Sequence, residues 1–122
     1  MKYKLTIVII ATVILIGGSI GETLYIKHTF NDLKQQLIEQ MNLSEYDVED
    51  VTETFEWWKK KAEVLEVFVS VLQLNEITVT LGELKGYVEK QDFESARALY
   101  NRIYMYAECV SDMYMVKFNN IL

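Results

Sequence analysis

Hydrophobic residues are distributed unevenly along the chain, with an unbroken apolar run near its start. Residues 5–21 contain no charged side chain, and as a helix they would be about 26 Å long. With Glu22 and the four residues after it, the length reaches about 33 Å, enough for a hydrocarbon core of about 30 Å. The pattern predicts a transmembrane anchor over residues 5–26. Its large aliphatic side chains are Leu5, Ile7, Val8, Ile9, Ile10, Val13, Ile14, Leu15 and Ile16.

A cleavable secretory signal is the alternative interpretation of this run. Lys2 and Lys4 form a basic start, and Ser19 and Gly21 are small residues at a spacing that signal peptidase accepts. We favour an uncleaved anchor, because the run is long for a signal and the helical pattern continues without a break. Since positive flanks stay in the cytoplasm, residues 1–4 are expected inside and residues 27–122 outside, as an extracytoplasmic helical domain.

The polar and apolar positions after the anchor alternate with a helical period. The apolar positions at steps of three and four form one stripe, which predicts that the first helix continues from the anchor to about residue 41 as an amphipathic stalk. This stripe consists of Ile26, Phe30, Leu33, Leu37 and Met41.

A second helix is predicted after a short connection at residues 42–44, with Ser44 as its N-cap. Its apolar positions form a seam with heptad-like spacing. The seam consists of Val48, Val51, Phe55, Trp58, Ala62, Leu65, Val69 and Leu72. The helix should continue to about residue 90. We expect a kink or short break near residues 76–86, because β-branched side chains and Gly82 and Gly86 weaken helical preference there.

A third helix is predicted after a turn at Gln91 and Asp92, with Asp92 as its N-cap. One face carries Ala96, Leu99, Ile103, Tyr106, Val110 and Met113, and it is widened by Tyr100, Tyr104 and Tyr114. The short connection favours antiparallel packing on the second helix. The predicted fold is therefore all-α. A transmembrane helix continues into a stalk, and the stalk packs with a long antiparallel helical hairpin in a three-helix arrangement.

Charge is asymmetric along the chain and limits the partners of the domain. Two lysines precede the apolar run, whereas the residues after position 21 include ten basic and 18 acidic side chains, a net charge of −8. An acidic surface of this kind is repelled by nucleic acid and by anionic head groups. We therefore expect no nucleic-acid binding, and contact with the lipid bilayer through the N-terminal helix.

Several single residues have both a structural and a functional interpretation. Cys109 is the only cysteine, so it is either buried or paired between chains, and its apolar surroundings favour burial. Trp58 lies on the predicted seam and should be in the core. Trp57, followed by three lysines, should be partly exposed. The only histidine, His28, has no recognisable catalytic partner nearby and is expected to face solvent.

No motif in the sequence indicates catalysis or ligand chemistry. The acidic residues between positions 45 and 56 lie on a predicted helix without the glycine turn of a calcium loop, so a charged helix start explains them better than a cation site. A Gly-rich phosphate loop, a paired-cysteine motif and an HExxH motif are all missing from the sequence. We expect a protein that is not an enzyme and that uses no cofactor or metal.

The overall layout resembles a known family. The markers are the basic start, the single span, the segment from Trp57 to Lys61, the turn at Gln91 to Phe93, and the end at residues 119–122. Together they are similar to a domain-of-unknown-function family of small, single-pass, membrane-anchored helical proteins from spore-forming, clostridia-type bacteria. The resemblance implies a helical ectodomain and supplies no activity or catalytic residue.

Two functions are consistent with these features. The first is a non-enzymatic interaction or structural module of the cell envelope, in which an exposed aromatic stripe of Tyr104, Tyr106, Tyr114 and Phe118 meets an envelope protein or a second copy of the chain. The second is a ligand-sensing ectodomain. With only about four residues expected inside, such a sensor would signal through a partner protein.

Overall fold

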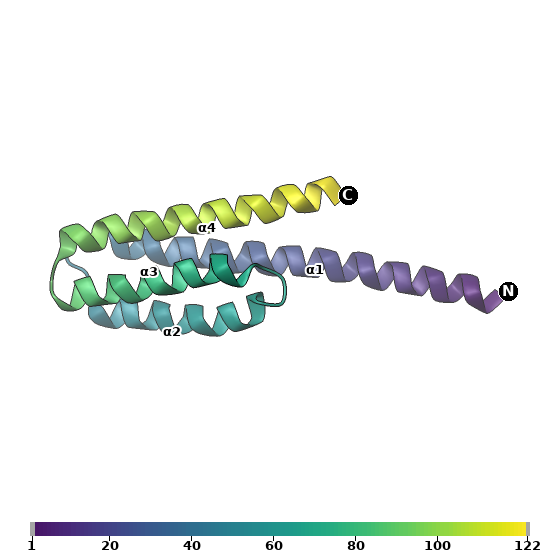
Figure 1. Ribbon diagram of the computed structural model, residues 1–122, viewed down its shortest axis with the longest axis horizontal. Helices are drawn as coiled ribbons and strands as arrows, with labels where there is room; N and C mark the ends of the chain where they lie inside the picture. Colours follow the sequence, from purple (N-terminus) through teal and green to yellow (C-terminus); the bar gives the residue numbers. More distant parts are fainter. Residues whose placement is uncertain (1, 122) are drawn as a thin grey trace.

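A computed structural model describes the backbone of residues 2–121 and the side chains of residues 3–115. The described part is all-helical and consists of α1 (Lys2–Met41), α2 (Val48–Leu65), α3 (Val71–Glu89) and α4 (Phe93–Ile121). The helices run alternately up and down, and each packs on the next, with α4 closing the ring against α1 (Figure 1). The result is an antiparallel four-helix bundle from which the first half of α1 projects.

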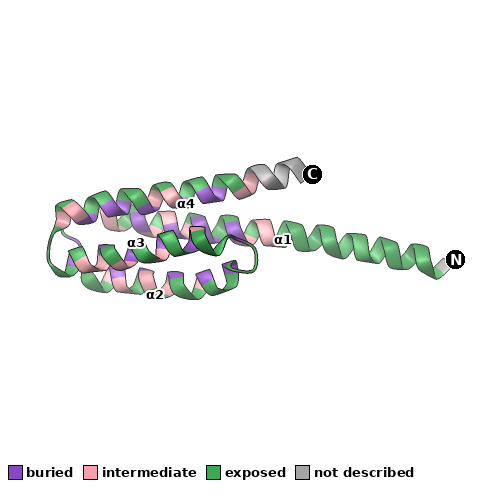
Figure 2. Ribbon diagram, viewed as in Figure 1, coloured by how far each residue is buried: buried purple, intermediate pink, exposed green. Residues whose placement is uncertain are grey.

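The buried residues lie where the four helices face one another (Figure 2). The stripe predicted on α1 is confirmed, since Ile26, Phe30, Leu33 and Leu37 are buried. Trp58 from α2 is fully buried, and its ring lies 5.7 Å from that of Phe30. The fully buried large side chains are Trp58, Tyr100, Phe30, Leu33, Leu37, Leu65, Leu74, Ile77, Leu81, Leu84, Ile103 and Val51.

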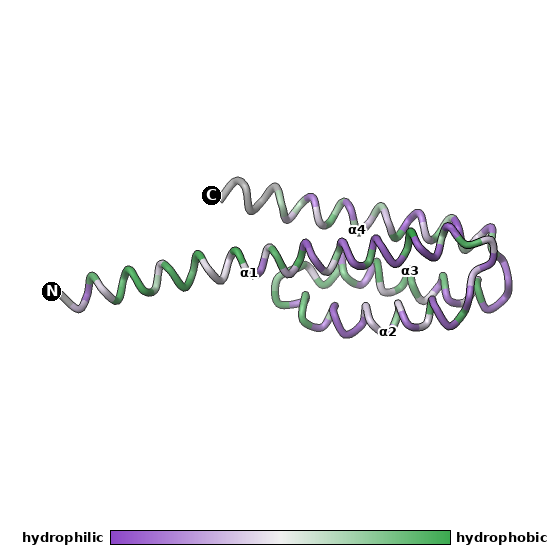
Figure 3. Tube along the Cα trace, turned by 180° about the vertical axis from the view of Figure 1, so that it is seen from behind, coloured by the Kyte–Doolittle hydropathy of each residue, from purple (hydrophilic) through white to green (hydrophobic). Residues whose placement is uncertain are grey.

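The projecting half of α1 is apolar and open to its surroundings. Every residue from 3 to 21 is exposed, including all nine aliphatic side chains of the predicted anchor surface. Figure 3 shows this segment as the most continuous hydrophobic stretch of the trace. Among the described residues, α1 is the one helix that is long and apolar enough to cross a membrane by length and composition.

The three-helix arrangement is wrong, because the predicted second helix is two helices. The chain leaves α2 after Leu65 and begins α3 at Val71, so the break lies at residues 66–70 and not near the glycines. Leu72, which the seam predicted to be buried, is 78% exposed. Turning back at this point brings Leu74, Ile77, Leu81 and Leu84 into the core, which one continuous helix could not do.

The helix passes through the region where a kink was expected. Gly82 and Gly86 lie within α3, and the side chain of Thr80 donates to the carbonyl of Glu76 one turn earlier. Each glycine lowers helical preference by about 1 kcal/mol relative to alanine. Burial of Leu81 and Leu84 stabilises the same turns by more than this, since a fully buried leucine contributes about 1.5–3 kcal/mol.

The predicted turn between the last two helices is confirmed, and one of the predicted caps is wrong. Asp92 lies just before α4 and accepts hydrogen bonds from the backbone N–H of Ser95 at 3.2 Å and from its hydroxyl at 2.8 Å. α2 begins later than expected, with Asp47 as its N-cap in place of Ser44. The Asp47 carboxylate accepts from the N–H of Glu49, so the connection spans residues 42–47.

Candidate functional site

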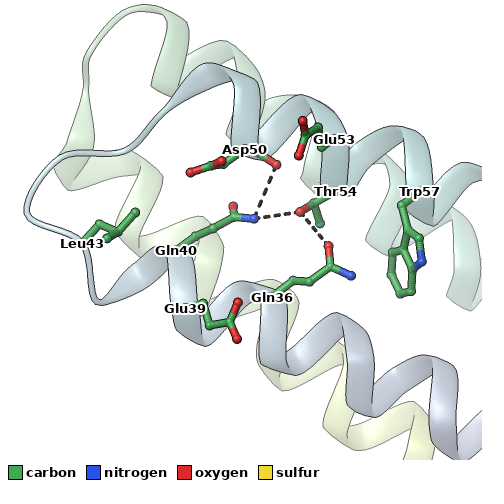
Figure 4. A pocket seen from close by; sticks show the side chains of 8 residues that line it. All are labelled: Gln36, Glu39, Gln40, Leu43, Asp50, Glu53, Thr54 and Trp57. Carbon is green, nitrogen blue, oxygen red and sulfur yellow. Dashed lines mark hydrogen bonds between the residues drawn. The ribbon is translucent and has the colours of Figure 1, made fainter.

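A chain of polar side chains crosses the bundle near the connection between α1 and α2. The Tyr100 hydroxyl on α4 donates to Gln40 Oε1 on α1 at 2.8 Å. Gln40 Nε2 then donates to Thr54 Oγ1 on α2 at 2.7 Å, and more distantly to the backbone carbonyl of Asp50 at 3.4 Å. Thr54 donates in turn to Gln36 Oε1 at 2.9 Å. Figure 4 shows how the two glutamines reach across from α1 to α2.

This network satisfies polar groups that are out of contact with water. Tyr100 is fully buried and Thr54 is almost so, and each has a hydrogen-bond partner of the correct kind. Burial raises the pKa of Tyr100 well above its ordinary value, and the nearby Tyr46 and Asp50 raise it further. The Tyr100 hydroxyl therefore stays protonated and remains a donor to Gln40. The network specifies which residues of three helices face one another.

Tyr46, in the connection before α2, extends the same region with aromatic contacts. Its ring lies 5.0 Å from Tyr100 and 5.4 Å from Phe93, both in edge-to-face geometry. Its hydroxyl accepts a hydrogen bond from Arg97 Nε at 3.2 Å, which raises the pKa of Arg97 above its ordinary value. Tyr46 is buried, so the connection is held against α4.

The glutamine side of the network lies at the wall of an open groove between α1 and α2. The groove has a volume of about 550 Å³ and is lined by Gln36, Glu39, Gln40, Leu43, Asp50, Glu53, Thr54 and Trp57. Figure 4 shows that the carboxylates of Glu39 and Glu53 come from opposite sides of it. From residue 39 to residue 56 the chain has seven acidic side chains and no basic one. The groove is therefore suited to a polar or cationic group rather than to an anion.

The groove is lined by hydrogen-bonding and acidic side chains. Amides, a threonine hydroxyl, carboxylates and one indole line it, and the described residues form no cluster of His, Cys, Asp and Glu that could hold a metal ion. Thr54 is the lining residue whose hydroxyl could serve as a nucleophile. That hydroxyl donates to an amide oxygen, however, which cannot act as a general base.

The aromatic residues predicted as an interaction stripe lie mostly against the core. Tyr104, Tyr106 and Tyr114 are half-buried and pack against the core cluster. Lys34 lies over the Tyr104 ring at 5.9 Å, and the Tyr114 hydroxyl accepts from the backbone N–H of Ser70 at 3.1 Å. The side chain of Phe118 lies outside the described residues. A four-helix core thus absorbs more aromatic area than the hairpin that was expected.

The remaining predicted residues divide into confirmed and corrected positions. His28 is exposed and pairs with Asp32 at 3.3 Å, and Trp57 is half-buried, as expected. Cys109 is exposed, so the prediction of burial is wrong. The neighbouring positions Val110 and Ser111 take the inward side of α4 in its place.

Sequence reasoning missed the network because it joins residues far apart in the chain. Gln36, Gln40 and Thr54 are not among the residues predicted to form the core or a site. One signal was available: two glutamines four residues apart, each directly beside a core position of the stripe, present amides at the edge of a helix interface. Comparison of the chain with models of protein families, with curated proteins and with solved structures finds no match.

Proposed function

We propose that this chain is a single-pass membrane protein whose acidic four-helix bundle lies outside the cell membrane and acts as a non-enzymatic interaction or structural module of the cell envelope. The observation that carries the proposal is the division of α1 into two halves. Its first half is apolar and fully exposed, and its second half supplies a core face of the bundle. Such a large exposed apolar rod is rare in water-soluble monomers and is normal for a helix surrounded by lipid.

The charges support one orientation of this anchor. Lys2 and Lys4 stand at the free end of the rod, and positive flanks favour the cytoplasmic side. The bundle at the other end carries the net charge of −8 and, on its far end, the acidic residues 39–56. A domain of this charge is repelled by anionic head groups, so the bundle stands away from them rather than lying flat on the surface.

The interaction role is assigned to α4. Tyr104, Tyr106 and Tyr114 keep part of their surface open, and Met105 and Met113 beside them are more than half exposed. They form the candidate contact surface for an envelope protein or for a second copy of the chain. Phe118, which the sequence also assigned to this surface, has its side chain outside the described residues. Aromatic and methionine side chains are enriched in the cores of such contacts.

The exposed Cys109 allows a direct test of location. Intact cells that express the chain are treated with a membrane-impermeant maleimide. The protein is then purified and its mass is measured by mass spectrometry. We expect Cys109 to be modified without lysis, because it is the only thiol and lies on the surface of the bundle. The matched control carries Cys109→Ala with Lys2→Cys, and its thiol should react only after permeabilisation.

Each outcome of this experiment has a definite meaning. Labelling of Cys109 only after lysis would place the bundle in the cytoplasm and contradict the orientation. A mature chain of lower mass, beginning near Glu22 and recovered from the medium, would show that α1 is cleaved and that no anchor remains. A full-length mass in the membrane fraction with surface labelling supports the proposal.

Sedimentation of the full chain in density-matched detergent tests the interaction surface. We expect either self-association or co-purification of an envelope protein, and loss of the complex in Met105→Lys. The control is Val79→Lys, an equally exposed position on α3. A monomer without any partner, unaffected by both substitutions, would count against an interaction module.

A ligand-sensing ectodomain is the second candidate function, and the groove between α1 and α2 favours it. A polar or cationic small molecule held by Gln36, Glu39 and Glu53 would bridge the two helices. Because α1 also forms the proposed anchor, a shift between α1 and α2 would reach the membrane along one helix. Polyamines and basic amino acids should then raise the unfolding temperature of the full chain, and Glu53→Gln should remove the effect.

A further inference from the structure

Exposed apolar side chains gather at one end of the bundle. Of the large hydrophobic residues exposed between positions 26 and 115, five lie within the nine positions from 64 to 72, and the others are scattered over all four helices and the α1–α2 connection. The five are Val64, Val67, Phe68, Val71 and Leu72, with Val67 at 75% exposure. We call them the apolar tip. The connection between α2 and α3 has three consecutive hydrophobic residues, Val67, Phe68 and Val69, between Glu66 and Ser70, and Figure 3 shows its middle as hydrophobic.

The apolar tip lies at the end of the bundle from which α1 projects (Figure 1). α2 runs antiparallel to α1, and two contacts fix their relative level. The ring of Trp58 meets that of Phe30, and Lys61 lies over the ring of Tyr25 at 5.6 Å. Since the helices are antiparallel, the last residue of α2, Leu65, therefore lies at the level of residues 21–23 of α1. The tip follows directly after this point.

This level coincides with the expected outer boundary of the bilayer. A hydrocarbon core of about 30 Å accommodates about 20 helical residues, which, counted from Leu5, ends near Leu24. We propose, on the basis of the membrane anchor proposed above, that the apolar tip is a second membrane contact, which inserts Val67, Phe68 and Leu72 into the lipid surface beside α1. The bundle is then held at two points and cannot tilt freely about its anchor.

The tip is held rigidly in the conformation that this contact needs. Leu65 and Val69 point into the core, and the backbone N–H of Ser70 donates to the Tyr114 hydroxyl on α4. These anchors leave Val67 and Phe68 facing outward. The insertion therefore requires no rearrangement of the loop, and little conformational entropy is lost when lipid covers it.

Charges of both signs lie near the tip, with Glu22, Glu63 and Glu66 at its level and lysines next to them on the side of the bundle. Lys60 and Lys61 lie on α2 before the tip, and Lys27 lies on α1 after the projecting segment. Basic and aromatic side chains at this level favour the head-group region. Glu63 and Glu66 are both exposed, and their side chains are long enough to extend toward head groups and water. The strongly acidic residues 39–56 are at the opposite end of the bundle.

A second copy of the chain is a poorer occupant for this surface. Two chains anchored in the same bilayer are related by rotation about the membrane normal, which brings the sides of their bundles together. Their membrane-facing ends remain pointed at the lipid. The partner of the tip is therefore the lipid surface itself.

Lipid quenching of a fluorescent label tests the contact in the full chain. In a Cys109→Ser background, single cysteines replace Val67 or Leu72 and are labelled with bimane, and the chain is reconstituted in phosphatidylcholine vesicles. We expect blue-shifted bimane emission. Most of this fluorescence should be lost when the lipid is replaced by phosphatidylcholine brominated near the head-group end of its acyl chains. Both positions are highly exposed, so the substitutions leave the core intact.

Three further labelled positions make the outcomes distinguishable. Val79→Cys and Met105→Cys report the sides of the bundle and should not be quenched. Val13→Cys lies near the middle of the anchor and should be quenched by phosphatidylcholine brominated near the ends of its acyl chains. Quenching at Val13 without quenching at Val67 and Leu72 overturns the second contact and leaves the anchor standing. Lack of quenching at Val13 overturns the anchor and this inference together. A blue shift at Val67 that brominated lipid does not quench shows that protein covers the tip, which also overturns the inference.

Discussion

Replacing Gln40 by leucine tests whether the polar network holds the bundle together. Gln40 is the acceptor for the buried Tyr100 hydroxyl, with a donor–acceptor distance of 2.8 Å. Leucine cannot accept, so Gln40→Leu leaves this hydroxyl unpaired in the core. A buried donor without a partner costs about 1–3 kcal/mol of stability. Thr54 loses one hydrogen bond as well but keeps its donation to Gln36.

The partner substitution separates the hydrogen bond from the change of shape. Tyr100→Phe leaves Gln40 without a donor, but Gln40 is only half-buried and water replaces the hydroxyl, so we expect a loss of about 0.5–1.5 kcal/mol. In the double variant neither group is unpaired. The two losses should therefore not add, and the coupling energy should be about 1–2 kcal/mol.

Guanidinium unfolding of the full chain in detergent measures these free energies. Trp57 and Trp58 are the only tryptophans, and both lie in α2, so their fluorescence reports the bundle rather than the projecting half of α1. For a domain of this size, 1 kcal/mol corresponds to about 4–8 °C in unfolding temperature. The control is Gln35→Leu, an exposed glutamine on the same helix, which should change stability by less than about 0.5 kcal/mol.

Two results would refute the reasoning. A Gln40→Leu variant as stable as Gln35→Leu would show that Tyr100 finds another acceptor and that the network contributes little. Strictly additive losses in the double variant, within about 0.5 kcal/mol, would show that the two side chains act independently.

Three other substitutions or conditions test separate parts of the fold. The raised pKa of Tyr100 means that the folded bundle keeps a proton that the unfolded chain releases, so stability should fall as pH rises above about 10, and less so in Tyr100→Phe. Leu33→Ala, at a fully buried position, should cost about 2–5 kcal/mol, whereas Leu72→Ala should leave the unfolding midpoint in detergent nearly unchanged. Gln91 has a φ of 60° after α3, so Gln91→Gly should stabilise by about 1 kcal/mol, while Glu89→Gly within the helix should destabilise by a similar amount; equal signs would contradict the assigned turn.

Helical periodicity predicted which faces are buried, because burial repeats with the helix. The stripe from Ile26 to Leu37 and the inward position of Trp58 followed directly from spacing. The turn at Gln91 was also predicted from the sequence, since a polar pair interrupts the apolar pattern there. The backbone then closes as a helix C-terminal motif, in which the N–H of Gln91 donates to Val88 and that of Asp92 donates to Tyr87.

The local sequence pattern did not predict the break between α2 and α3, because three of the residues in the break are apolar. Val69 and Leu72 continue the hydrophobic spacing of the seam, Val67, Phe68 and Val71 are apolar as well, and residues 66–70 include neither glycine nor proline. The local weakness at Gly82 pointed to the wrong place, since core burial overrides a preference of about 1 kcal/mol. Length was the better signal: one helix from 48 to 89 would be about 63 Å long, whereas the 29 residues of α4 span about 44 Å.

The candidate site was beyond prediction for a different reason. Its hydrogen bonds join positions 14, 18 and 60 residues apart, so it exists only once the register of three helices is known. A wrong helix count also distorts the expected surface. With a fourth helix to pack against, Tyr104 and Tyr106 become half-buried, and exposed apolar residues also gather at the tip at residues 64–72.

The sharing of one helix between the proposed anchor and the bundle also changes the energetics of folding. Starting a helix in water is unfavourable, because about three residues must be fixed for the first hydrogen bond. A segment inside the bilayer must already be helical, since lipid offers its backbone no other hydrogen-bond partners. The stalk from Ile26 to Met41 then extends an existing helix, gaining one hydrogen bond for each residue that it orders. With α1 inserted as proposed, we expect it to present its buried stripe before the other three helices pack, and we expect the bundle to be most stable with the anchor in the bilayer.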